Sequence, residues 1–294
     1  MTVTGHLGSV PDLQRLFEVG SIIPYWWVGE GILKIELSGQ RKGFCSEDIL
    51  HRITKERKRF FNQSSLVFRL ALVDGTAVTY KETNIKLFKN GGFQMTGVSS
   101  EAMARAALTR LMALNAGRGI WPEEPTIKVF EVQMMNSDYS IGRAIRRDRL
   151  HRTLVETYGL WSTFEPTIYQ GVNTKFFWNK ARPTSAPPGI CVCPTPCEGN
   201  GDGTKIGACK KITISPFRTG SVIITGAKNM EQLTDAYIFM NGVFTRHADQ
   251  VLRPLEEVQE LSPRRVAAPA GAEAILRQKM RASPRNILMV AAVR

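Results

Sequence analysis

The sequence lacks the features that mark membrane and secreted proteins. No apolar run reaches the roughly 18 residues that a membrane-spanning helix needs, so we expect no membrane partner. Residues 1–15 lack the basic and then apolar pattern of a secretory signal, so we expect an intracellular protein. The glycosylation-like sequence that begins at Asn62 is accordingly interpreted as a coincidence.

Catalytic signatures are missing as well. The four histidines are scattered and have no consistent carboxylate or cysteine partner. The glycine-rich residues 199–205 resemble a phosphate-binding loop, but they lack its Gly-Lys-Ser/Thr ending and open no helix after a strand. No paired carboxylates or activated nucleophile stand out, so we predict that the protein is not an enzyme and has no small-molecule substrate.

Acidic residues are scarce relative to basic ones. The chain of 294 residues has 26 acidic and 39 basic side chains, which give a formal net charge of +13. Such an excess predicts attraction to a polyanion, most often nucleic acid. The alternative is a basic tail that only aids solubility, but the charge is spread through the body of the chain as well.

What the sequence does contain is a repeat. Residues 85–97 are IKLFKNGGFQMTG, and residues 214–226 are ISPFRTGSVIITG. Four pairs match at a constant offset of 129 residues: Phe88 and Phe217, Gly91 and Gly220, Thr96 and Thr225, Gly97 and Gly226. A repeat of this length predicts two similar lobes in one pseudo-symmetric body.

Periodicity predicts the elements of each lobe. Each copy of the repeat has the pattern of a strand, a turn, a strand and then a helix, at residues 101–114 in the first copy and after Gly226 in the second. Further strands are predicted at residues 32–37, 66–72, 127–135 and 171–178, and helices from Ser46 and within 141–157. These elements predict an α+β fold with one antiparallel sheet, helices on one face and an open second face where a partner could bind.

Composition and the repeat together divide the chain into four parts. They are an N-terminal extension at 1–29, a first repeat at 30–125, a second repeat at 126–250 and a basic Ala/Pro-rich tail at 251–294. A Cys/Pro/Gly-rich insertion interrupts the second repeat at 179–210. The tail is predicted to be a flexible arm with one short helix at about 272–281.

The second copy resembles the TATA-binding protein family of general transcription factors. Residues 217–228 are FRTGSVIITGAK, similar to the family's Phe, turn, apolar strand and Thr-Gly-Ala-Lys. FEPTIYQG at residues 164–171 resembles its Tyr-Glu-Pro and Phe-Pro-Gly element, and FEVQ at residues 130–133 resembles an opening strand. The likeness covers residues 30–250, and the insertion and tail are closest in style to the divergent relatives of nucleocytoplasmic large DNA viruses.

The resemblance implies a two-lobe saddle, in which one curved antiparallel sheet has its helices on the convex face. It implies a transcription initiation factor that binds and bends double-stranded DNA through the minor groove and recruits transcription factors or RNA polymerase subunits. The implied location is the nucleus, a viral replication site or the virion. The alternative is a saddle-fold protein-interaction or DNA-packaging module that has lost TATA recognition, because Met134 occupies the place of a family Asn and Asn136 is the nearest one.

The resemblance also implies which residues contact DNA. In the family a Phe beside each turn wedges between base steps, which corresponds to Phe88 and Phe217 here; ordinary packing at the sheet edge is the alternative. The second wedges correspond to Tyr169 and to Phe61 or its neighbour Phe60. Alternation places four more candidates on the open face, namely Ile223, Thr225, Gln94 and Thr96. The candidate phosphate contacts, each alternatively a solvated surface charge, are Lys228, Lys175, Lys86, Arg69 and Arg218.

Two basic runs are predicted on segments that face away from the sheet, where they could bind flanking DNA or an acidic partner. They are Arg52, Lys55, Arg57, Lys58 and Arg59, and Arg143, Arg146, Arg147, Arg149 and Arg152.

Four of the five cysteines lie in the insertion: Cys191, Cys193, Cys197 and Cys209. Four thiolates in a loop without its own core suit a structural zinc ion, although the spacing is not that of a standard zinc finger. Disulfides in an oxidising particle and free thiols are the alternatives. Cys45 is interpreted as an ordinary thiol.

Overall fold

The computed structural model describes residues 1–50 and 61–254. Its strands are β1 (Thr2–His6), β2 (Gly31–Leu37), β3 (Gln40–Gly43), β4 (Gln63–Asp74), β5 (Ala77–Phe88), β6 (Gly92–Thr96), β7 (Val129–Ser140), β8 (Trp161–Thr163), β9 (Asn173–Trp178), β10 (Lys210–Pro216) and β11 (Ser221–Ala227). Its helices are α1 (Leu13–Val19), α2 (Ser46–Leu50), α3 (Glu101–Leu114), α4 (Arg147–Glu156), α5 (Met230–Arg246) and α6 (Ala248–Val251). Among these helices, none is both long and apolar enough to cross a membrane.

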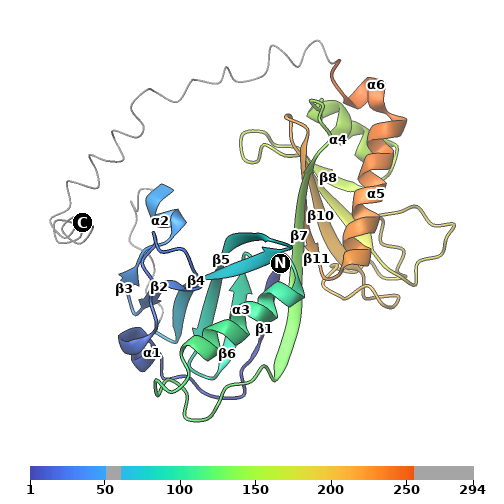
Figure 1. The fold of residues 1–294 in the computed structure, drawn as a ribbon. Coiled ribbons are helices and arrows are strands. Elements are labelled where there is room, and N and C mark those ends of the chain that lie inside the picture. The colour runs from blue at the N-terminus through green and yellow to red at the C-terminus, as the bar shows by residue number, and fades with distance from the viewer. Residues whose placement is uncertain (51–60, 255–294) are drawn as a thin grey trace, which may run out of the picture.

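One antiparallel sheet of eleven strands runs through the whole described chain, in the order β3-β2-β4-β5-β6-β1-β7-β11-β10-β9-β8. From the centre outward, the first half has β1, β6, β5, β4 and β2, and the second half has β7, β11, β10, β9 and β8. Both halves therefore repeat one topology, and β3 is an additional edge strand. Figure 1 shows β7 between the halves, α1 and α3 against the first half and α5 along the second. This arrangement confirms the predicted α+β fold.

Alternating side chains of the strands build one core in each half. In the second half Ile212, Ile214, Val222 and Ile224 are fully buried with residues of α4 and α5, as the alternation predicts. Their counterparts Ile85, Phe93 and Met95 are buried with residues of α1 and α3. Burying one such side chain contributes about 1.5–3 kcal/mol, so the helices are fixed to one face of the sheet.

The repeated glycines have a backbone reason. Gly91 and Gly220 both have positive φ, 83° and 93°, and Gly97 and Gly226 follow with 80° and 92°. Only glycine adopts this region readily. A Cβ on Gly220 would also lie 2.3 Å from the Arg143 carbonyl oxygen, so the turn has no room for a side chain. The sequence repeat is therefore a repeat of backbone conformation.

The segment predicted as an N-terminal extension contains a central strand instead. β1 pairs with β6 on one side and with β7 on the other, and α1 follows it within the same segment. The Met1 ammonium donates to the Val98 carbonyl oxygen at 2.7 Å. The strand was missed because only Val3 among its five residues is apolar, so no alternation is visible in the sequence.

The first half also departs from the prediction that all helices lie on one face. Leu66 and Phe68 of β4 point into the core beneath α1 and α3, so Val67 points to the opposite face. Val67 is buried there with Leu33 and Cys45, the residue before α2. We call residues 21–30 together with α2 the cover, because both lie on the otherwise open face.

The two halves differ in one connection as well. β4 and β5 form a long hairpin joined by Gly75 and Thr76, whereas β9 and β10 are joined by the cysteine-rich insertion. Four sequence predictions lie outside the described residues: the first basic run, Phe60, the tail as an arm, and its short helix.

Candidate nucleic-acid interface

The open face is defined as the sheet face not covered by α1, α3, α4 and α5. In the second half a row of directly paired side chains crosses it: Trp161, Lys175, Thr213 and Thr225. Lys175 Nζ donates to Thr213 Oγ1 at 2.8 Å. Burial, and then the nearby charge of Lys211, lower the pKa of Lys175. A bound anion would offset both effects, because it favours the charged ammonium.

An aromatic pair closes the end of this face. The rings of Tyr169 and Phe217 meet edge to face with centroids 5.7 Å apart. Val172 N–H donates to the Pro216 carbonyl oxygen at 2.9 Å, which places Gly171 opposite Phe217. A Cβ at Gly171 would lie 2.9 Å from the Tyr169 ring and 3.1 Å from the Phe217 ring. We call Tyr169 and Phe217 the wedge pair.

Arginines flank the wedge pair. Arg147, at the start of α4, donates to the carbonyl and the side-chain oxygen of Gln170 and lies over the Phe164 ring, 5.0 Å from its centroid. Burial, and then the charge of Arg218, lower the pKa of Arg147. Arg147 of the second basic run thus contacts the loop that carries Tyr169. Arg149 and Arg152 remain exposed on α4.

The first half has a matching but looser end. Phe88 pairs with Gln63 across β4 and β5, and Phe61 lies two residues before Gln63 and is exposed. Tyr169 likewise lies two residues before Gly171, so strand register makes Phe61 the counterpart of Tyr169. Within the described residues, no aromatic contact joins Phe61 to Phe88.

The remaining candidate DNA contacts of the first half differ in whether other parts of the chain already bond to them. Lys86, Gln94 and Thr96 lie on the open face, and Lys86 is exposed. Arg69 is engaged with the cover. Its guanidinium donates to the carbonyl oxygens of Trp27 and Tyr25, at 2.6 and 2.9 Å, and its side chain is 11% exposed. Arg69 is therefore not free for a phosphate in this structure.

The centre of the open face is polar and partly acidic. Gln133 Nε2 donates to Thr4 Oγ1 at 2.8 Å and to Glu131 Oε2 at 3.1 Å. Asn136 and Asp138 are both exposed on β7, and Asp138 pairs with Ile223. The sequence analysis missed the carboxylates of Glu131 and Asp138. The face on which each of them lies depends on the pairing register of β7, which only the tertiary structure fixes.

The four cysteines of the insertion lie together. Their Sγ atoms all lie within 4.8 Å of one another, and the hydrogen-bond-length pairs are 3.4, 3.4, 3.8 and 4.0 Å apart. Zn–S bonds of about 2.3 Å in a tetrahedron require sulfur atoms about 3.8 Å apart. Gly207 N–H and Asn179 Nδ2 donate to Cys193 Sγ and Cys209 Sγ, as donors around a thiolate site do. The cluster could therefore hold a metal ion.

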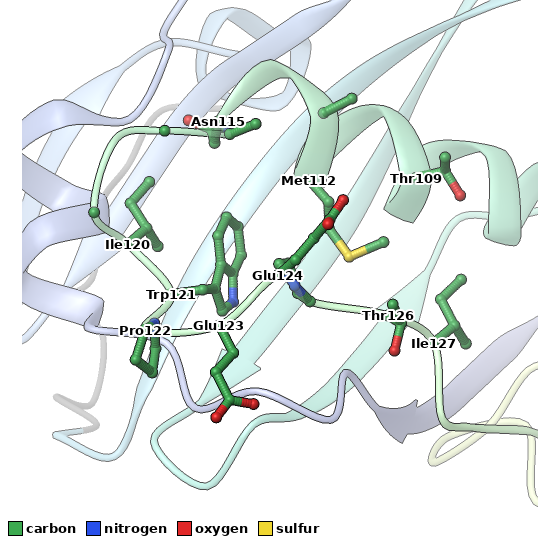
Figure 2. Close-up of a pocket in the computed structure, with 15 residues that line it drawn as sticks. Thr109, Met112, Asn115, Ile120, Trp121, Pro122, Glu123, Glu124, Thr126 and Ile127 are labelled. Atoms are coloured by element: carbon green, nitrogen blue, oxygen red, sulfur yellow. The ribbon is translucent and has the colours of Figure 1, made fainter.

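A pocket of about 840 Å³ lies on the helix-covered side of the first half. Figure 2 shows its residues along the end of α3 and the loop that follows, with Trp121, Glu123 and Glu124 from that loop. Trp121 Nε1 is buried and has no hydrogen-bond partner in the described part of the chain. The pocket is separate from the open face.

The fold and this face define a class. It is an α+β protein with pseudo-twofold symmetry, in which helices cover one side of a shared sheet in both halves and the other side is an open face with basic residues at its edge. No family model matches the sequence. The "TATA-box-binding protein-like" protein of Acanthamoeba polyphaga mimivirus is 28% identical over 278 residues, which are 87% of this chain and 67% of that protein. The solved structure of Methanococcus jannaschii TBP covers 83% of this chain and 95% of its own, with 17% identity and a TM-score of 0.43. Over most of its length the chain is therefore similar in sequence to a TATA-box-binding-protein-like protein.

Proposed function

We propose that the protein is a transcription initiation factor that binds and bends double-stranded DNA through the open face. The observation that carries the proposal is the wedge pair, which stands at the end of a polar face that also presents Lys175. Exposed aromatic rings can enter between base steps in the minor groove, and flanking cations bind the phosphates on either side.

The contacts have distinct roles in this proposal. Cations bind the phosphate backbone and set the salt dependence of affinity, and the candidates are Lys175, Lys228, Lys86 and Arg218. Polar and apolar side chains meet the base edges, and the candidates are Asn136, Gln94, Thr96, Ile223 and Thr225. The minor groove distinguishes A·T from G·C mainly by the guanine amino group, so this set favours coarse sequence preference with a strong contribution from DNA shape.

A second function is supported by the centre of the face. Glu131 and Asp138 place carboxylates where a duplex would lie, and carboxylates repel its phosphates. Of the saddle-fold modules without TATA recognition, one for protein interaction accommodates these charges better than one for DNA packaging, because a basic protein surface pairs with carboxylates and duplex DNA does not.

Bending and sequence preference separate the two functions. Duplexes of about 20–30 base pairs, either A·T-rich or G·C-rich, carry a donor and an acceptor dye at their ends, and energy transfer reports the bend. The initiation factor should bend the A·T-rich duplex and lose affinity on Phe217→Ala. Tyr237→Ala, on the helix-covered face, is the matched aromatic control. Straight DNA, equal affinities and no effect of Phe217→Ala would support the saddle-fold module without TATA recognition.

We further propose that transcription factors or RNA polymerase subunits bind the helix-covered face, in the nucleus or at a viral replication site. The pocket beside α3 lies on this face and offers the unpaired Trp121 Nε1 as a donor. Ala116→Trp should fill the pocket and reduce transcription from a bound promoter without changing DNA affinity. An unchanged transcript yield would exclude the pocket as the site of recruitment.

We also propose that the four-cysteine cluster holds zinc. The sulfur separations and the two N–H donors fit a closed structural site. Elemental analysis of the purified full chain should give one zinc per protein, and Cys209→Ser should abolish it. Cys45→Ser is the control, because Cys45 lies outside the cluster. A metal-free protein with an unchanged unfolding temperature would contradict the proposal.

A further inference from the structure

The two halves offer different areas of open face to a ligand. Val67 pairs with Asn84, and Lys175 pairs with Thr213. Asn84 and Thr213 are 129 residues apart, which is the offset of the sequence repeat. Their pairing partners Val67 and Lys175 are therefore counterparts. Lys175 is partly exposed beside the exposed Trp161, whereas Val67 is 5% exposed and lies beneath the cover.

Arg69 fixes one part of the cover. Besides its two bonds to backbone carbonyl oxygens of residues 21–30, its guanidinium lies 5.2 Å from the Tyr25 ring centroid. It also lies 3.8 Å from Glu82, whose other carboxylate oxygen accepts from Ser46 N–H and Ser46 Oγ. One arginine and one glutamate on the sheet therefore hold both parts of the cover.

A buried ion pair fixes α2. Lys34 Nζ lies 3.2 Å from Asp48 Oδ1, and the two side chains are 4% and 3% exposed. Asp48 also accepts from Arg41, and from the N–H and Sγ of Cys45. Removing one partner of such a pair leaves an uncompensated buried charge, so displacing α2 is strongly unfavourable. Opening the cover would in addition expose Leu33, Val67 and Cys45.

We infer that the cover stays closed when DNA binds, so that the duplex contacts the second half in full but only β5, β6 and β1 of the first half. The inference rests on the proposed function and adds to it an off-centre DNA contact surface. The exposed Trp26 and Trp27 of the cover then lie beyond the duplex contact and not within it.

Hydrogen exchange of the full chain, read by mass spectrometry with and without an A·T-rich duplex, tests this inference. DNA should slow exchange at residues 161–171, 217–221 and 88–92 and leave residues 21–30 and 44–50 unchanged. Slower exchange in the cover would show that DNA contacts it, and faster exchange would show that DNA displaces it; either result overturns the inference. Salt-independent binding with no slowed segment would instead overturn the proposed function.

Cys45 gives a second readout of the cover, because its thiol is 1% exposed beneath it. Maleimide labelling of Cys45, located by peptide mapping, should be slow and unchanged by DNA. Tyr25→Ala should raise the labelling rate at least about tenfold through local opening, with DNA affinity kept within about twofold. Rapid labelling of the unliganded wild type would show an open cover and overturn the inference without reference to DNA.

Discussion

The first and second halves share one topology but use the open face differently. The second half presents Lys175, Thr213 and the wedge pair along an uncovered face. The first half buries the corresponding area under the cover and leaves Phe61 and Phe88 apart. The comparison teaches that a repeated fold preserves packing on the helix side while its opposite side diverges, because the helix side of both halves is constrained by core volume.

The largest expected effect is a loss of stability caused by a substitution in the cysteine-rich insertion between β9 and β10, the connection in which the halves differ. Cys209→Ser removes one ligand of the proposed zinc site from an insertion that contributes little core of its own, so we expect a loss of about 3–5 kcal/mol in unfolding free energy. Thermal and urea unfolding measure it. Cys45→Ser should change stability far less, because a serine hydroxyl can still donate to Asp48. Equal effects of the two substitutions would remove the special role of the cluster.

The next effect compares the two wedge ends. Phe217→Ala should weaken DNA binding by about 1–3 kcal/mol, because one ring no longer stacks on a base step. Phe88→Ala should weaken it less, because Phe88 has no aromatic partner to orient it in the described structure. Fluorescence anisotropy and bend angle measure both. A larger loss from Phe88→Ala would reverse the inferred dominance of the second half.

Acid should loosen the first half before the second. Burial opposes ionisation of Asp48, but its hydrogen bonds from Cys45 and the charge of Lys34 outweigh burial and lower its pKa. Its stabilising contribution is therefore complete above the ordinary value of about 3.9 and is lost as pH falls from there towards the lowered pKa. Hydrogen exchange should increase first in the cover on acidification. Asp48→Asn should remove this pH dependence; an unchanged acid profile would contradict the role of Asp48.

Lys175 and Arg69 form a matched pair of cations on the same face. Lys175→Ala should weaken DNA binding by about 1 kcal/mol and reduce the salt slope by about 1. Arg69→Ala should leave the salt slope unchanged and lower stability instead, because its donors serve the cover. Binding titrations at several salt concentrations separate the two outcomes. A reduced slope for Arg69→Ala would mean that DNA reaches the covered area.

The smallest expected effect concerns the centre of the face. Asp138→Asn removes a carboxylate that faces the duplex, so affinity should rise by about twofold at low salt and less at high salt. Ser140→Ala, on the same strand face, is the neutral control. A loss of affinity on Asp138→Asn would indicate that this carboxylate binds a cation or a protein partner.

Several elements were predictable because their determinants are local. α3 was predicted with its observed bounds from the spacing of its apolar residues. The turn glycines and the buried set of β10 and β11 followed from the repeat and the alternation. Phe217 and Tyr169 followed from family resemblance, and the structure brings their rings together. Their role in DNA binding remains a prediction.

Other features were not predictable because distant segments decide them. β1 is a strand only because β6 and β7 supply hydrogen-bond partners on both sides. Arg69 looked equivalent to Lys175 as a cation beside the open face, but the carbonyl oxygens of Tyr25 and Trp27 occupy its guanidinium. Arg147 looked like part of a helical basic run, but its contact with Gln170 brings it beside the wedge pair.

The sequence by itself determined the duplication, the α+β class, the turn conformations and the grouping of four cysteines, because each depends on residues close together in the chain or on their periodicity. The tertiary structure alone decided which parts of the open face are available. A charged side chain or an aromatic ring is available to a ligand only when no other segment of the chain already pairs with it. Such pairing depends on contacts between residues far apart in sequence, such as Lys34 with Asp48 and Arg69 with Tyr25.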